Sequence, residues 1–346
     1  GDDGQPRMVA DTWISYLTKG RGTPNGEGSG QLTAGYGART DPSKDGGKIG
    51  PEFTFGIYMQ KSLKQPILII KTAWGGKSLH TDFRPPSAGP YELNDSEIES
   101  IAKRGGNLEE ERAKRKSQSG VYYRLMMDHV QDVLKEIQRV YPGYDSKQGY
   151  EIAGFVWFQG WNDVVNGRVY PRRGQPGGYD KYSEWMAMFI RDVRKDLESP
   201  NMPFVIGVLG VNGPIDNISE RYRDIHGTFR EAMAAPASLD EFHGNVVAVS
   251  TAPFWDMPLD RIQKRREKLN QLKRSLQNQV KNGELTKEGA ANKLTEIEAS
   301  STEDAELWKR GASNAGYHYY GCAKTMARIG RAFADAMLKM QPDTSD

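Results

Sequence analysis

The stretch Pro66-Ile-Leu-Ile-Ile-Lys-Thr-Ala-Trp-Gly-Gly-Lys-Ser78 indicates the fold class of this chain. Its first half is a continuous apolar run, which is typical of a strand that is buried on both faces of a parallel sheet. Its second half is rich in glycine and polar residues, as expected where a strand ends at the edge of an α/β sheet. The stretch therefore predicts a parallel α/β sheet and a tight turn at residues 71–78, at the edge where α/β folds place their sites.

Further segments extend this pattern. Three more apolar runs are expected to be strands: Ile152–Phe158, Pro203–Leu209 and Asn245–Ser250. Apolar residues at spacings of three and four predict helices over residues 121–140, 180–197 and 322–338. The alternation predicts one α/β domain over residues 1–346, built as a three-layer sandwich with a mostly parallel sheet. The glycine-rich residues after Trp13 show no periodicity and predict a long ordered loop, so no opening strand is expected.

Residues 257–312 interrupt the alternation and predict a helical hairpin inserted in the domain. Segment 261–281 has eight Lys or Arg and one Glu, whereas segment 284–306 has seven acidic residues and two Lys. Opposite charges on consecutive helices favour an antiparallel pair, with the break at Asn282-Gly283. A solvated insertion is the favoured interpretation. An oligomer contact through this hairpin is the alternative.

Composition excludes several classes of function. The net charge of +2 over 346 residues gives no electrostatic signature of nucleic acid or membrane binding, and no apolar run is long enough to span a bilayer. The single cysteine, Cys322, excludes an intrachain disulfide and is expected to be buried. The five histidines include no pair at metal-ligand spacing, so neither a metal nor an organic cofactor is expected.

Three blocks of residues could carry chemistry. The glycine block, residues 71–78, ends in Gly-Lys-Ser, but a phosphate loop would need glycine where Lys71 stands. Its backbone N–H groups suit a developing oxyanion instead, although an ordinary tight turn has the same composition. The glutamine block, residues 154–163, offers the polar side chains of Gln159, Asn162 and Asp163, which also suit helix capping. The histidine block, residues 314–321, places His318 on a loop before the last helix, a suitable position for a general base.

Together these blocks resemble the SGNH-hydrolase superfamily, and within it the sialate O-acetylesterase-like carbohydrate esterases. The segments that carry the resemblance are Ile49–Gly56, Ile69–Gly76, Val156–Gly160 and Gly316–Lys324. The resemblance covers most of residues 49–93, 120–256 and 313–340, and it implies a flavodoxin-like sandwich. It also implies a serine esterase that removes acetyl groups from glycans.

The family's chemistry implies a role for several residues of this sequence. His318 corresponds to the base, Gly75 and Gly76 to the backbone oxyanion donors, and Gln159 to the amide donor. Asp163 is the candidate acidic partner, because Trp161 and Ala315 occupy the positions where relatives often carry a carboxylate. A Ser–His dyad without a carboxylate is the alternative.

The family's nucleophile block, Gly-Gln-Ser-Asn after the first strand, does not occur in this sequence. The chain opens Gly-Asp-Asp-Gly without an initiator Met or a signal peptide. We therefore expect that it starts after the first strand and the nucleophile, and that on its own it is inactive. Ser78 and Ser313 lie near the blocks but not in a nucleophile-like context.

The expected partner is an acetylated carbohydrate. Residues predicted to bind it are Trp161, Asn162, His80, Arg84 and Tyr317, with Tyr319 and Arg39 as further candidates. Aromatic faces suit sugar rings and an arginine suits a sugar carboxylate. Related enzymes are often exported, so a secreted or periplasmic location is expected. A non-catalytic glycan-binding protein of the same fold is the alternative function.

Overall fold

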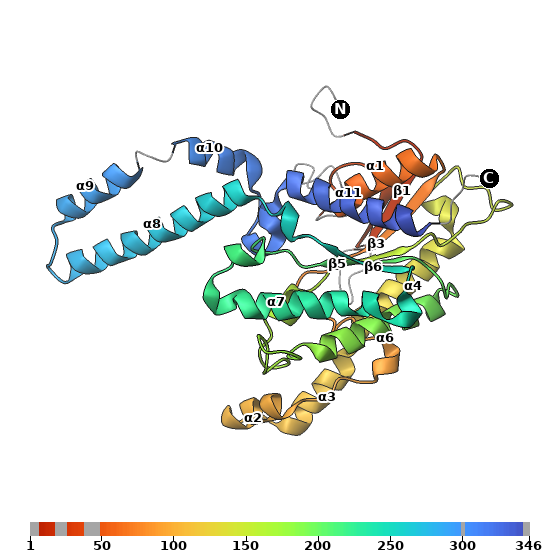
Figure 1. Cartoon of the computed structure of the whole chain (residues 1–346), viewed down its shortest axis with the longest axis horizontal. Helices are drawn as coiled ribbons and strands as arrows, with labels where there is room; N and C mark the ends of the chain where they lie inside the picture. Colours follow the sequence, from red (N-terminus) through yellow and green to blue (C-terminus); the bar gives the residue numbers. More distant parts are fainter. Residues whose placement is uncertain (1–6, 18–25, 38–48, 299–301, 342–346) are drawn as a thin grey trace.

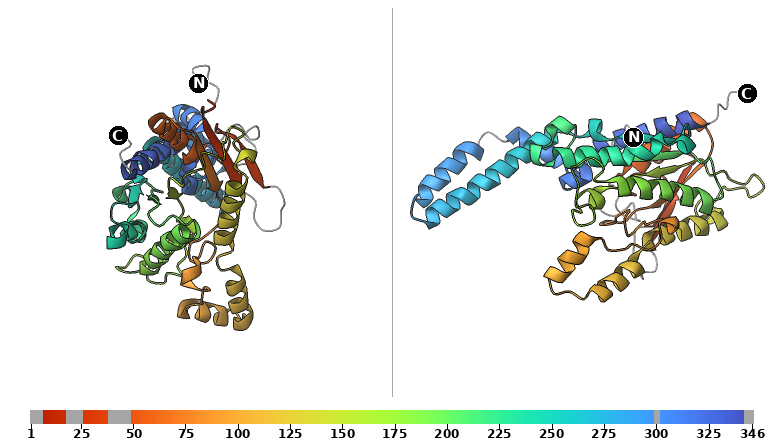
Figure 2. Two further views of the ribbon diagram at one scale, coloured as in Figure 1. Left: turned by 90° about the vertical axis from the view of Figure 1, so that its right-hand side faces the viewer. Right: turned by 60° about the horizontal axis from the view of Figure 1, so that its bottom comes forward.

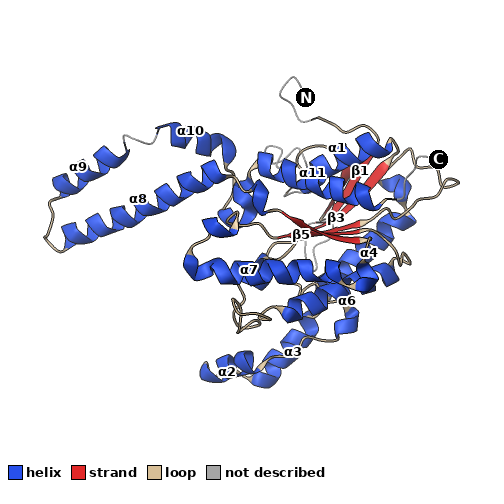
Figure 3. Cartoon of the chain, in the orientation of Figure 1, coloured by secondary structure: helices blue, strands red, loops and turns tan. Residues whose placement is uncertain are grey.

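The computed structural model describes residues 7–17, 26–37, 49–298 and 302–341. Strands lie in a central layer between helices on both faces (Figure 1). Helices α1 (Pro51–Leu63) and α11 (Ala323–Met340) pack together on one face. Helices α4 (Val121–Lys135), α6 (Asp180–Asp196) and α7 (Glu220–Ala234) lie on the other face, as the colouring by secondary structure shows (Figure 3). This arrangement agrees with the predicted α/β class.

All four predicted strands are confirmed, although some are shorter than the apolar runs that predicted them. They are β3 (Ile67–Thr72), β4 (Phe155–Trp157), β5 (Phe204–Val208) and β6 (Val246–Ser250). The last three form a parallel sheet in the order β4-β5-β6, with Val205 opposite both Val156 and Val247. Strand β5 is buried along its whole length, as a central strand of a covered parallel sheet should be.

The prediction of a loop after Trp13 is wrong for two segments. Residues Thr12–Leu17 form strand β1 and Glu27–Gln31 form β2, which pair antiparallel. Strand β1 also pairs parallel with β3, with Ile14 opposite Ile69. The burial of Ile14 and Tyr16 in a small second core stabilises β1, whereas the glycines of β2 give no side-chain signal for a strand.

The prediction of one continuous sheet is also not met among the described residues. Strands β2-β1-β3 form one three-stranded sheet and β4-β5-β6 form another. The edge strands β3 and β4 line opposite sides of one cavity, whose residues are described below. The helices cover both sheets, so the two sheets share one layered body.

The helices predicted at residues 121–140, 180–197 and 322–338 are present as α4, α6 and α11. The remaining helices of the body are the short α5 (Trp161–Val164) and the pair α2 (Asp95–Lys103) and α3 (Leu108–Gln118). Helices α6, α7 and α11 enclose the main core, where Phe189, Phe204 and Phe333 are fully buried. This core fixes the strands whose ends carry the glutamine block.

Residues 257–311 form an arm that extends away from the body (Figure 2). Helix α8 (Met257–Lys281) runs outward, and α9 (Lys287–Glu298) and α10 (Thr302–Gly311) return beside it. The turn contains Gly283 with a φ of 77°, which favours glycine. The base of the arm belongs to the body, because Leu259 and Ile262 are buried in the main core. No helix within the described part of the chain is long and apolar enough to cross a membrane.

Candidate active site

The glycine and glutamine blocks are joined by hydrogen bonds at the ends of β3 and β4. The side-chain amides of Gln159 and Asn162 both donate to the carbonyl oxygen of Lys77, at 2.9 and 3.2 Å. Strands β3 and β4 therefore end at the same side of the molecule, as parallel strands of an α/β fold do. The contact brings together two of the three blocks that the sequence singled out.

Asp163 is the buried centre of this junction. Its carboxylate accepts hydrogen bonds from the backbone N–H of Leu79, the amide of Gln159 and the hydroxyl of Tyr170, at 2.7 to 2.9 Å, and a longer one from His80 N–H. Asp163 has no solvent exposure, and its hydrogen bonds within the described residues include none to His318. Its observed contacts hold the glycine block against the glutamine block rather than orient the imidazole.

Gly75 and Gly76 expose their backbone beside open space. A Cβ atom built on either residue would meet no atom within 4 Å. Gly76 has a φ of 74°, in the left-handed region that favours glycine. The turn therefore presents accessible backbone at the end of a strand, the arrangement that an oxyanion site needs.

The histidine block is a strained loop fixed by two buried tyrosines. Tyr319 and Tyr320 have φ values of 52° and 58°, which are uncommon for bulky residues. The Tyr319 hydroxyl accepts from the backbone N–H of Gly210 and bonds the Thr251 hydroxyl, each at 2.7 Å. Burial raises the pKa of Tyr319 to about 12. Backbone strain held by such anchors is characteristic of functional sites. Tyr319 lines the cavity, but its side chain is buried.

His318 itself projects from this loop and is exposed. Its Nδ1 lies 3.1 Å from the side-chain oxygen of Asn314. Partial loss of solvent around the ring lowers the pKa of His318 below its ordinary value, which favours the neutral form that a base needs. Asn314 is not among the site residues predicted from the sequence. An amide four residues before the histidine was the signal that could have found it.

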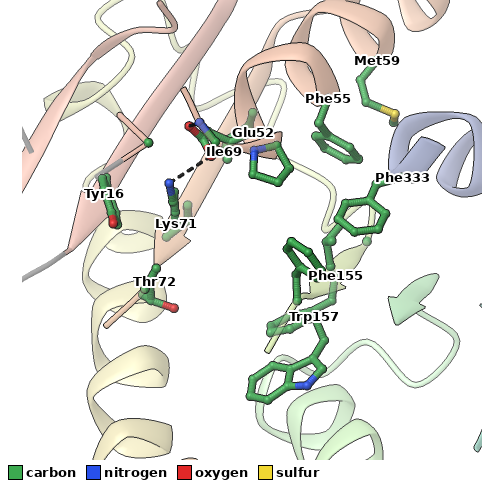
Figure 4. A pocket seen from close by; sticks show the side chains of 18 of the residues that line it. Tyr16, Glu52, Phe55, Met59, Ile69, Lys71, Thr72, Phe155, Trp157 and Phe333 are labelled. Atoms are coloured by element: carbon green, nitrogen blue, oxygen red, sulfur yellow. Dashed lines mark hydrogen bonds and ion pairs between the residues drawn. The ribbon is translucent and has the colours of Figure 1, made fainter. Parts of the chain in front are cut away.

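The histidine block meets the glutamine block through aromatic stacking. The rings of Trp161 and Tyr317 are 5.7 Å apart with an interplanar angle of 24°, and Tyr317 also contacts the His318 ring edge-on. Tyr317 remains 46% exposed, so its ring offers a free surface at the site. All three blocks line a single cavity of about 2270 Å³, to which Gly75, Gln159 and His318 contribute. Figure 4 shows the part of this cavity that is lined by Ile69, Lys71, Phe155 and Trp157.

Comparison with known proteins places this arrangement in a family. A family model described as "Carbohydrate esterase, sialic acid-specific acetylesterase" matches residues 36–243, which is more than half of the chain. The chain belongs to this carbohydrate esterase family. The match includes the glycine and glutamine blocks, whereas His318 and the arm lie beyond it.

Solved structures show more distant similarity. A protein from Arabidopsis thaliana is 18% identical, with a TM-score of 0.40 over 72% of this chain and 71% of that chain. A carbohydrate acetylesterase from Xanthomonas citri is 16% identical, with a TM-score of 0.38 over 70% of this chain and 42% of that one. A search of curated proteins found no match.

Two residues predicted to bind the carbohydrate of this esterase family lie away from His318. His80 is buried and lines a smaller neighbouring cavity of about 370 Å³, with Thr81 and Asn166 as hydrogen-bond partners. Burial lowers the pKa of His80. Arg84 donates to the carbonyl oxygens of His80, Ala88 and Gly89 and lines neither cavity, so its observed role is to brace its own loop. Arg39 lies outside the described residues.

Within the described residues, no serine hydroxyl forms a hydrogen bond with His318. Ser78 bonds Asp82 and Ser313 bonds the carbonyl of Gly321. Among the described residues, the serine hydroxyl that contacts a histidine ring is that of Ser15, 2.9 Å from Nε2 of His129. Ser15 is fully buried and also donates to Glu27, so this pair belongs to the interior of the fold. Cys322 is buried, as expected.

The assembled site offers groups for acyl transfer. His318 can accept a proton, Asn314 can hold its ring, and the turn at Gly75 and Gly76 can donate to an oxyanion. Both hydrogens of the Gln159 amide are engaged, one by Lys77 and one by Asp163. Gln159 can therefore reach an oxyanion only if its amide leaves the Lys77 carbonyl.

Proposed function

We propose that the protein is a carbohydrate O-acetylesterase of the serine type. The observation that supports it best is the meeting of the glycine, glutamine and histidine blocks at one cavity, with an exposed, preferentially neutral His318 at its rim. Membership of the carbohydrate esterase family supports an acetyl ester as the bond that is cleaved.

The reaction would proceed by acyl transfer. A serine hydroxyl attacks the carbonyl carbon of the acetyl ester while His318 accepts its proton. The backbone N–H groups of Gly75 and Gly76 stabilise the oxyanion, and the imidazolium then protonates the departing sugar hydroxyl. Water repeats the sequence to release acetate and restore the serine. We propose that the serine lies in a segment that precedes these residues, because the family resemblance implies a Gly-Gln-Ser-Asn block and residues 1–346 do not contain it.

The sugar would lie against Tyr317. Its exposed ring, supported from behind by Trp161, offers a flat apolar face next to His318. Asn162 also lines the cavity, and since its amide donates one hydrogen to Lys77, its second hydrogen or its oxygen can bind a sugar hydroxyl. An acetylated extracellular polysaccharide would make a secreted or periplasmic location appropriate.

The test compares two histidines in the polypeptide extended upstream through its reading frame. His318→Ala should lower kcat for 4-nitrophenyl acetate and for acetylated glycans by about 1,000-fold or more, because the base is lost. His243→Ala is the matched control, since His243 is exposed and lines neither cavity. Acetate release is measured together with the thermal midpoint, which both variants should keep within about 2 °C because both side chains are exposed.

Unchanged turnover in His318→Ala would rule out the proposed base. The polypeptide of residues 1–346 alone should show only background hydrolysis. Glycan binding without hydrolysis by the extended polypeptide would instead favour a non-catalytic binding protein.

A further inference from the structure

A second, smaller cavity adjoins the candidate active site, and the proposed reaction does not use it. Its volume of about 370 Å³ is at the lower end of the roughly 300–1,000 Å³ of small-molecule sites, a size that suits one sugar ring. Gly76, Lys77 and Asn162 line both cavities, so the two cavities meet at the turn that carries the proposed oxyanion donors. A ligand whose reacting group lies at this turn can therefore extend into the second cavity.

The outer wall of the second cavity comes from the end of α3 and the start of α4. The residues that line it there are Arg115, Gln118, Val121 and Tyr122. Helices α2 and α3 extend from the body at the bottom of Figure 1, so this projection supplies the two α3 residues. Two backbone hydrogen bonds fix the wall to the glycine block, because Gly120 N–H donates to the carbonyl of Thr81 at 2.8 Å and Tyr122 N–H donates to that of Asp82 at 2.9 Å.

The charged side chains around this cavity balance one another. Lys77 faces Asp82, with 3.5 Å between Nζ and Oδ1, and Arg115 faces Glu97, with 3.8 Å between Nη2 and Oε1. His80 also lines the cavity, and burial lowers its pKa, which favours the neutral ring. Among the described residues, the positive charges at this cavity are therefore matched by negative ones. Such a balance suits an uncharged ligand better than an anion.

Both ion pairs leave polar atoms with capacity for a ligand. Their lengths exceed the roughly 2.7–2.9 Å of a strong charge-assisted hydrogen bond. Oδ2 of Asp82 accepts from the backbone N–H and the hydroxyl of Ser78, at 2.9 and 2.8 Å, whereas Oδ1 faces Lys77. The Lys77 ammonium lies over the ring of Tyr122, 4.2 Å from its centroid, which holds it beside this carboxylate. A hydroxyl next to the pair can donate to Oδ1 and accept from Nζ at once.

Amide and apolar groups complete the lining. Gln118 and Asn162 bring side-chain amides, which can both donate to and accept from hydroxyl groups. Val121 and Tyr122 bring apolar surface, which suits the C–H face of a sugar ring. The ring of Tyr122 is supported edge-on by Trp74, with 5.1 Å between the centroids. Paired charges, amides and an aromatic ring in one small cavity are the groups that recognise an uncharged carbohydrate.

We propose that the second cavity is a subsite for an uncharged sugar ring, linked to the acetylated sugar that lies in the first cavity. The substrate is then an oligosaccharide or polysaccharide rather than a single sugar, and Arg115 and Gln118 of α3 determine specificity for it. The identity of the acetylated neighbour rests on the proposed function. Binding of a sugar in the second cavity does not require hydrolysis, so the two proposals can fail separately.

Binding can be measured on residues 1–346 without any esterase activity. The probes are three neutral disaccharides, cellobiose, xylobiose and lactose, and one acidic disaccharide, cellobiouronic acid. We expect at least one neutral disaccharide to bind with a Kd below about 10 mM in saturation-transfer NMR, and cellobiouronic acid to bind no more tightly than cellobiose. Failure of all three neutral probes to bind would overturn the subsite. Much tighter binding of the acidic probe would overturn its uncharged character.

A pair of substitutions on α3 tests the location. Gln118→Trp should fill part of the cavity and raise the Kd of the neutral disaccharide about fivefold or more, because the added ring occupies the space of the sugar. Ser117→Trp adds the same ring one residue away, at an exposed position outside both linings, and should keep the Kd within about twofold. Equal Kd values for the two variants would overturn the location.

A second pair of substitutions avoids added bulk. Arg115→Ala removes a donor from the cavity and should raise the Kd about threefold or more. Arg112→Ala is the matched control, since Arg112 lies on the same helix, pairs with Glu109 and lines neither cavity. The thermal midpoint identifies variants that remain folded. An unchanged Kd in a folded Arg115→Ala variant would exclude Arg115 as a specificity residue.

The kinetics of the upstream-extended polypeptide separate the subsite from the esterase chemistry. Gln118→Trp should raise KM for an acetylated xylo-oligosaccharide and leave KM for 4-nitrophenyl acetate unchanged, because only the oligosaccharide reaches the second cavity. Disaccharide binding that Gln118→Trp weakens, without ester hydrolysis, would support the subsite and count against the proposed function. Hydrolysis of both esters with the same KM before and after the substitution would overturn the subsite and leave the proposed function intact.

Discussion

Gly75 and Gly76 are adjacent glycines that differ in backbone conformation. Both border the same open space, but only Gly76 has a left-handed backbone. We expect Gly76→Ala to lower the free energy of unfolding by about 1–2 kcal/mol, because alanine is strained at that φ. Gly75→Ala is the matched control and should change it by less than about 0.5 kcal/mol. Urea denaturation measures both, and equal losses would contradict this account of the turn.

The protonation of His318 depends on the partial loss of solvent around its ring. Its pKa lies below the ordinary value because the ring is partly desolvated, so the native protein binds fewer protons than the unfolded chain in that interval. The stability that this residue contributes is therefore lost as the pH falls from the ordinary pKa through the lowered one. Because its pKa is lowered, the His318 ring stays neutral at a lower pH than a free imidazole does, and it can act as a base there.

Replacing Asn314 by Asp should reverse the direction of this shift. A carboxylate 3.1 Å from Nδ1 would stabilise the imidazolium and raise the pKa of His318. The acid limb of kcat/KM in the extended polypeptide should then move to higher pH. Titration of the ring by NMR in residues 1–346 measures the effect without any need for activity. Asn282→Asp, in the turn of the arm, should leave the titration unchanged, and an unshifted ring in Asn314→Asp would disprove the contact.

At the scale of elements, the arm divides into a base that belongs to the body and an outer part that does not. At the base, Asp260 accepts from Tyr320, which packs against Trp308, so the arm contacts the histidine block. Farther out, Arg265 forms an ion pair with Asp304 across the two sides of the arm. The outer part makes its contacts within the arm, as expected of a solvated insertion.

Shortening the arm should therefore leave the body intact. Replacement of residues 266–303 by a short Gly/Ser linker keeps the base with Asp260, Arg265 and Trp308. We expect the thermal midpoint to change by less than about 2 °C, which for a chain of this length corresponds to roughly 1–2 kcal/mol. Light scattering should show the same assembly state for the intact and the shortened protein, with molar masses that differ only by the residues removed. A fall from an oligomer to a monomer would show that the arm is an assembly element.

At the scale of the whole molecule, the sequence predicted the α/β class because four apolar runs and three amphipathic periods are local signals. It missed β1 and β2 because their stability comes from pairing and from the burial of Ile14 and Tyr16. It also did not predict that the strands form two separate sheets. Pairing between strands that are distant in sequence cannot be recognised from the residues of either strand alone.

The residues of the candidate site could be predicted from the sequence to about the same extent as the fold. The three blocks were found because each follows a strand or precedes a helix, and the structure brings them to one cavity. The partners of individual side chains were not predictable. Arg84 and Asp163 are engaged by groups within the fold, and Asn314 contacts His318 through a loop whose shape depends on two strained tyrosines.

Among the described strands, β3 and β4 each have one unpaired edge, which has a practical consequence for handling the protein. Unpaired apolar edges are templates on which strands of other molecules can add, and this growth depends on concentration. Preparations of residues 1–346 should therefore be prone to precipitate when concentrated or warmed.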